Sequence, residues 1–189
     1  MEVEMTKKLI LLSFIALALI VGGCSKQNPF EAQSDSTIND GEQISLAKKV
    51  SVPLKGYFET VIETFYPIEF VNGVPVKFEM HIVGTGIVSH LGNCTVAFDQ
   101  IADYSVNPTA PTLTAPNVVV TAANGDELYF ESYGTANDNG TGNPTFTGSF
   151  TFTGGTGRFS NASGSVTFTG GANLVTMTGE FSFAGRILY

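Results

Sequence analysis

A small set of side chains in this chain of 189 residues has the types and spacing for acid–base chemistry. Glu59 and Glu63 lie in a stretch whose alternation predicts a strand, so they share one face with Tyr57. If that face pointed inward, burial would raise the pKa of both carboxyl groups and create a general acid pair. We favour the outward orientation, because a buried carboxylate without a partner is costly.

The two histidines are the other candidates for proton transfer or metal binding. His81 shares a strand face with Lys77 and Glu79, which predicts a solvated ring. His90 lies in the predicted turn Ser89–Gly92, where a ring nitrogen that bonds the backbone is favoured over a functional role. Two histidines and one unpaired cysteine do not make a convincing zinc ligand set, so we predict no metal and no cofactor.

Cys24 is the residue with the clearest predicted chemistry. It follows two lysines, an apolar run over 9–21 and the small pair Gly22-Gly23, which is the three-part plan of a secretory signal. The run is too short to span a bilayer, which takes about 20 apolar residues. The segment Val21-Gly22-Gly23-Cys24 resembles the lipobox of bacterial lipoproteins, and the resemblance implies cleavage before Cys24 and lipid attachment to it. An uncleaved helix or a plain secretion signal is the alternative.

The same resemblance implies a location. Ser25, at the second position of the mature protein, differs from the aspartate of an inner-membrane retention signal, so we expect a lipid-anchored protein of the bacterial cell envelope, at the outer membrane. We predict a signal peptide over 1–23, a lipidated Cys24 with a flexible linker over 24–51, and a folded domain over 52–189. Acidic residues near the N-terminus make Met5 an alternative start.

Composition limits the partners of the mature chain. The two acids and two lysines of the signal cancel, so the mature chain keeps the formal net charge of −8. This charge argues against nucleic acid or anionic lipid headgroups as partners. Once Cys24 carries lipid, Cys94 has no disulfide partner, and we predict that it is a small buried hydrophobe rather than a reactive thiol.

Alternation with a period of two residues predicts an all-β domain. Over 145–153 every even position is Phe or Gly and every odd position is Thr or Ser, so one face is apolar and the other is wet. This phase places Phe150, Phe168 and Phe181 inside and Thr151 outside. Turn residues, with Asn124-Gly125 as the clearest hairpin signal, divide the domain into eight strands at 52–65, 75–88, 93–104, 117–123, 126–134, 144–153, 164–170 and 173–187.

Glycines on the apolar faces permit the bends that close a small barrel, and closure removes free edges. We therefore predict an eight-stranded antiparallel barrel, with a two-sheet sandwich as the alternative. In an up-and-down barrel the long connections share one end, and the linker joins the other. Because loops on a rigid scaffold carry most recognition, we predict that this rim is the functional surface and points away from the membrane. It would hold Tyr66, Phe70, Pro108, Pro111, Pro116 and residues 137–143.

Two segments resemble a known family. The run Gly154-Gly155-Thr156-Gly157-Arg158-Phe159-Ser160-Asn161-Ala162-Ser163-Gly164 is similar to the glycine-rich turn G-G-T-G-x-F-x-x-A-x-G of dirigent proteins and allene oxide cyclase-like barrels, and residues 84–92 resemble a segment of their bacterial relatives. We interpret the glycine motif as a wide turn in which Phe159 and Ala162 plug one barrel end. The cavity residues of the plant enzymes have no match here, so cyclase or coupling chemistry is not carried over.

Two classes of function remain. The first is a lipid-anchored binding or interaction module whose barrel holds a small apolar ligand or serves as a scaffold; the alternative is a cyclase- or isomerase-like enzyme acting on a hydrophobic substrate inside the barrel. A filled core favours a scaffold, whereas a partly polar cavity with convergent Tyr, His or Glu favours an enzyme. No catalytic residue is predicted. The candidate ligand-binding residues are Tyr57, Glu59, Tyr66, Phe70 and His90.

Overall fold

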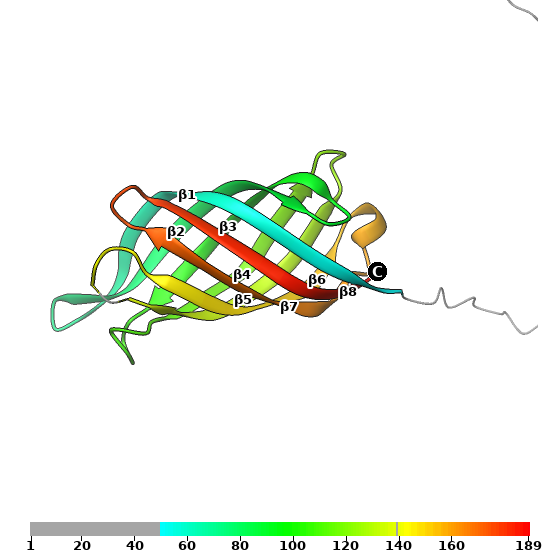
Figure 1. The fold of residues 1–189 in the computed structure, drawn as a ribbon. Coiled ribbons are helices and arrows are strands. Elements are labelled where there is room, and N and C mark those ends of the chain that lie inside the picture. Colours follow the sequence, from blue (N-terminus) through cyan, green and yellow to red (C-terminus); the bar gives the residue numbers. More distant parts are fainter. Residues whose placement is uncertain (1–49, 139) are drawn as a thin grey trace, which may run out of the picture. The chain divides into compact units, whose positions relative to one another are not determined.

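The computed structural model describes residues 50–138 and 140–189, which form a closed barrel of eight β-strands (Figure 1). Each strand is antiparallel to both neighbours, and β8 pairs with β1. The predicted barrel is confirmed, and the two-sheet alternative is wrong. Within these residues, no helix has the length and apolar character needed to cross a membrane. The strands are β1 (Ser51–Val71), β2 (Val74–Val88), β3 (Gly92–Asp103), β4 (Thr112–Ala122), β5 (Glu127–Asn137), β6 (Thr145–Gly155), β7 (Ser163–Asn173) and β8 (Thr178–Leu188).

The predicted strand phase is visible in β6 and its neighbours. Phe150 points into the barrel and is buried, whereas Thr151 is exposed on the outer wall. Phe168 of β7 and Phe181 of β8 are buried on the same inner face. The ring centroid of Phe150 lies 4.4 Å from that of Phe168 and 4.6 Å from that of Phe130. These phenylalanines therefore form the centre of the core, as the alternation predicts.

β1 is longer than expected. The prediction ended this strand at 65 and placed a loop over 66–74, but β1 runs to Val71 and β2 begins at Val74. The connection is the two-residue turn Asn72-Gly73, whose φ values are 51° and 80°. Positive φ at both positions is what a tight type I′ hairpin requires.

The far part of this β1–β2 hairpin projects beyond the barrel (Figure 1). β8 pairs with β1 only as far as Val61, and the Ile62 amide donates a last hydrogen bond to Met177 on that side, so beyond Ile62 β1 is paired on one side, by β2. Pro67 is tolerated in the strand because one edge is free here and the pairing is irregular next to it. Tyr66 and Phe70 therefore belong to a strand rather than to a loop.

β4 and β7 also run through predicted turns. β4 begins at Thr112 instead of 117 and includes Pro116 in the barrel wall. β7 continues through the predicted turn at 171–172 to Asn173. Gly170 lies within the strand rather than in a turn. A Cβ at this position would overlap a backbone carbonyl of β8, so glycine is what lets the two strands approach each other.

The glycine-rich segment closes one end of the barrel, as predicted. A short 3-10 helix, η1 (Gly157–Phe159), places Phe159 in the core with 0% of its surface exposed, and Ala162 beside it is buried. Gly154, Gly157 and Gly164 have φ values of 136°, 52° and 111°, which residues with a side chain rarely adopt. The motif therefore has a structural task at this end.

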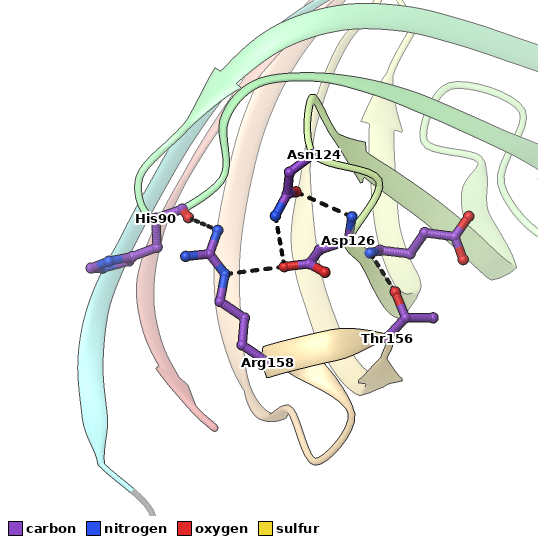
Figure 2. A network of polar contacts seen from close by, with 6 residues as sticks. His90, Asn124, Asp126, Thr156 and Arg158 are labelled. Carbon is purple, nitrogen blue, oxygen red and sulfur yellow. Dashed lines mark hydrogen bonds and ion pairs between the residues drawn. The ribbon is translucent and has the colours of Figure 1, made fainter. Parts of the chain in front are cut away.

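Arg158 joins this closing segment to two neighbouring turns (Figure 2). Its guanidinium donates a hydrogen bond to the carbonyl of His90 between β2 and β3, and its Nε lies 3.5 Å from the carboxylate of Asp126 between β4 and β5. Asn124 donates a 3.0 Å hydrogen bond to the same carboxylate. Three connections are thus fastened together at the closed end.

Removal of the Arg158 side chain is expected to loosen this end. We predict that Arg158→Ala lowers the free energy of unfolding by about 1 kcal/mol, because it deletes a charge-assisted hydrogen bond and a partly exposed ion pair. Urea denaturation, which adds no salt, measures the change. Ser160→Ala, in an exposed position of the same turn, is the control and should change stability by less than about 0.5 kcal/mol. Equal losses in both variants would contradict the role given to Arg158.

Candidate ligand-binding cavity

A cavity of about 80 Å³ lies inside the barrel, between the closed half and the opposite mouth. Phe150, Phe168 and Phe181 line it on the closed side, where they belong to the main buried cluster. Phe65 and Leu174 line it on the mouth side, where both side chains are partly exposed. The cavity therefore faces the end of the barrel opposite to η1.

An irregularity in β4 explains why side chains do not fill the barrel at this level. Pro116 and Asn117 of β4 together oppose the single residue Glu131 of β5, and the ladder with β3 is interrupted over the same stretch. Such a bulge bends the strand and disrupts the local pairing. The bend coincides with small side chains in the lining, which leave space between the larger ones: Ala102, Ala136, Ala172 and Gly179.

The lining is mainly apolar, and none of its described residues is charged. Its polar side chains are those of Thr60, Gln100, Tyr104 and Ser132. The Tyr104 hydroxyl donates a 3.4 Å hydrogen bond to Asp138, and burial, together with this carboxylate, raises the pKa of Tyr104 above its ordinary value. The tyrosine therefore stays protonated near neutral pH and serves as a hydrogen-bond donor.

Tyr57 and Glu59 lie on the outer wall, outside this cavity. Phe58 between them is fully buried, so the alternation of β1 turns both neighbours outward. The Tyr57 hydroxyl donates a 2.8 Å hydrogen bond to Glu180, which is the main cause that raises the pKa of Tyr57 to about 12. Glu63 is exposed as well. The outward orientation of the carboxylates is confirmed, and the inward acid pair is wrong.

The histidines also lie away from the cavity. His90 is in the β2–β3 turn at the closed end, with a φ of 71°, and its Nε2 is 2.9 Å from the carbonyl of Pro53, which confirms the predicted bond to the backbone. The His81 ring is partly exposed, and it also has two carboxylate neighbours. Its Nδ1 lies 2.6 Å from Asp99, and its Nε2 lies 3.9 Å from Glu63. Among the described residues, no cluster of three or more His, Cys, Asp or Glu is arranged to hold a metal ion.

The mouth opposite to η1 collects the β1–β2 turn and the described parts of three further connections, which are residues 104–111, 138 with 140–144, and 174–177. The amide of Asp138 donates to the carbonyl of Thr109 at 2.9 Å, which ties two of these connections together. The predicted sharing of one end is confirmed.

Large apolar side chains gather at this mouth. Tyr66 and Phe70 on the projecting hairpin are 46% and 57% exposed. Of the three prolines predicted for the rim, Pro108 is exposed there and Pro111 is buried in the same connection, whereas Pro116 lies in the β4 wall, so the rim prediction is wrong for Pro116. Further exposed apolar residues of the hairpin and the connections are Ile68, Val71, Val74, Val106 and Val175.

Gln100 and Ser132 are candidate site residues beyond those predicted from the sequence. Both occupy inward positions, since Gln100 follows Phe98 by two residues in β3 and Ser132 follows Phe130 by two in β5. A polar residue in the apolar phase of a strand is the signal that would have found them.

Comparisons with known proteins give a structural similarity but no match in sequence. No protein family model matches the chain, and no curated protein matches it. One solved structure that is similar is that of a pterocarpan synthase dirigent protein, at 12% sequence identity and a TM-score of 0.47, over 84% of this chain and 99% of that chain.

Proposed function

We propose that this protein is a lipid-anchored module of the bacterial cell envelope that binds a small apolar molecule inside its barrel. The observation that carries the proposal is the uncharged, mainly apolar cavity beside the mouth. Apolar walls with a few polar groups are typical of small-molecule sites. In a barrel that serves only as a scaffold, side chains would be expected to fill the core and leave no such cavity.

The size of the cavity limits what it can hold. A dry engineered cavity of roughly 150 Å³ binds benzene, whereas this one has about 80 Å³. It therefore suits a group of a few carbon atoms, either a small ring or the end of a chain that leaves through the mouth. The stacked rings of Phe65 and Phe78, 5.0 Å apart, continue the apolar surface from the cavity onto the hairpin.

Binding is favoured over catalysis by the chemistry of the lining. General acid–base catalysis requires a side chain that gains or loses a proton near the operating pH. Tyr104 is the titratable side chain among the described lining residues, and its pKa is raised. Tyr57, Glu59 and His90, the other candidates, face away from the cavity.

The proposed anchor is compatible with access to the mouth. Ser51 at the start of β1 pairs with Leu188 at the end of β8, at the closed end of the barrel. A lipid on Cys24 would thus attach the domain through the end that carries η1, and the mouth would remain open to solvent. Cys24 itself lies outside the described residues.

A small hydrocarbon tests the cavity. We predict that cyclopentane shifts the methyl resonance of Met80, which lines the cavity, and raises the free energy of unfolding by about 1.4 kcal/mol at a free concentration ten times its Kd. Ala136→Leu, which places a larger side chain in the lining, should abolish the shift. Thr135→Leu, at the exposed neighbouring position, should leave it intact. No response of the unmodified protein to either cyclopentane or its ketone, cyclopentanone, would refute the proposed binding.

A further inference from the structure

Two polar side chains that line the cavity make no hydrogen bond that stabilises the described fold. Neither the amide of Gln100 nor the hydroxyl of Ser132 makes a hydrogen bond to another described residue of the chain. Within the same residues, no fully buried side-chain nitrogen or oxygen lacks a partner. The free groups of Gln100 and Ser132 are therefore accessible, and the space that they reach is the cavity that they line.

These two side chains flank the bulge in β4. Gln100 of β3 lies where the ladder with β4 is interrupted, between Ala97 and Ile101. Ser132 of β5 pairs with Ala115, the last regular residue before the bulge. The backbones of β3 and β5 are two strand spacings apart, roughly 10 Å, and both side chains point inward. A group of ligand size placed against the bulge would meet both.

We propose that the ligand carries one neutral hydrogen-bonding group, a carbonyl or a hydroxyl, which lies against the β4 bulge and bonds to Gln100, with Ser132 as the second partner. This inference rests on the proposed binding function and names the class of its ligand. The primary amide of Gln100 offers both donors and an acceptor, so it accommodates either group.

The lining excludes a charged ligand group. The described lining residues provide no opposite charge, and an ion buried without one loses its hydration without compensation. A wholly apolar ligand is also disfavoured, because it would displace the water that can satisfy Gln100 and leave the amide unpaired. Sites built around a polar group discriminate strongly against analogues that lack it.

The test compares cyclopentanone with cyclopentane, which differ by the carbonyl group. The Met80 methyl resonance reports both, since Met80 lines the cavity and pairs with Gln100 across β2 and β3. In Gln100→Leu, which has similar volume without the amide, we expect the preference for cyclopentanone relative to cyclopentane to fall about tenfold. Asn117→Leu removes an exposed amide on the outside of the same bulge and should leave the preference unchanged.

Ser132→Ala provides a second, smaller perturbation and should reduce the same preference about threefold. If both molecules bind and neither Gln100→Leu nor Ser132→Ala changes their ratio, the polar contact is refuted while the binding function stands. Binding of cyclopentylammonium as tight as that of cyclopentanone would also overturn the inference. If neither neutral molecule binds the unmodified protein, the proposed function itself fails.

Discussion

Phe150→Ala is expected to lower the free energy of unfolding by about 3–5 kcal/mol. The Phe150 ring is 5% exposed and contacts four other rings of the core. Truncation removes these contacts and enlarges a space that already exists, because Phe150 lines the cavity. Small domains have a stability of about 5–15 kcal/mol, so this one change would remove a large share of it. Chemical denaturation in urea measures the loss.

Thr151→Ala is the matched control at the next position of β6. Thr151 is exposed on the outer wall, and substitutions at such positions change stability by about 0.5 kcal/mol or less. The comparison therefore tests the direction of the two side chains rather than the general tolerance of β6. Losses of equal size would show that the strand phase is wrong.

The parts of the fold that the sequence predicts are those with regular alternation. In the central parts of β6, β7 and β8, apolar residues or glycine alternate with polar residues, and the inward direction of the phenylalanines is confirmed. The glycine-rich turn is also predictable, because Phe159 is a large apolar residue in an otherwise polar and glycine-rich segment. Period-two patterns specify which face a residue occupies.

Strand ends were less predictable because the same residues can serve two purposes. Gly170 and Gly171 have the composition of a turn, yet both lie within β7, and Gly170 allows close contact between β7 and β8. Pro116 has the composition of a loop, yet it occupies a bulge where the missing amide hydrogen is tolerated. In both cases the neighbouring strand determines whether the residue lies in a turn or in a strand. Local composition does not show which strand that neighbour is.

The site was predicted less well than the fold for a related reason. Alternation assigns Gln100 and Ser132 to the interior, but their height in the barrel depends on the register of β3, β4 and β5. The cavity exists because a bulge and several small residues coincide at one level. The pair of His81 and Asp99 likewise arises from cross-strand register. Residues distant in the sequence meet only after the strands are aligned.

Cys24→Ser is expected to release the protein from membranes completely. Lipid attachment at a signal of this type requires the cysteine thiol. Cys24 directly follows Val21-Gly22-Gly23, and the other cysteine of the sequence, Cys94, is far from this segment. Without lipid, a mature chain with a formal net charge of −8 has no electrostatic attraction to anionic headgroups. Fractionation of bacteria that express the variant, together with labelling by radioactive fatty acid, measures the effect.

Cys94→Ser separates the loss of lipid from the loss of a thiol. Cys94 is buried in β3, where its Sγ lies 3.6 Å from the carbonyl of Gly86, and burial raises the pKa of its thiol, so it is shielded from modification. This variant should keep both the membrane fraction and the label, while Cys24→Ser loses both. If Cys24→Ser remains in the membrane fraction or still incorporates the labelled fatty acid, the anchor is not at Cys24, and the proposed attachment through the closed end of the barrel no longer has a basis.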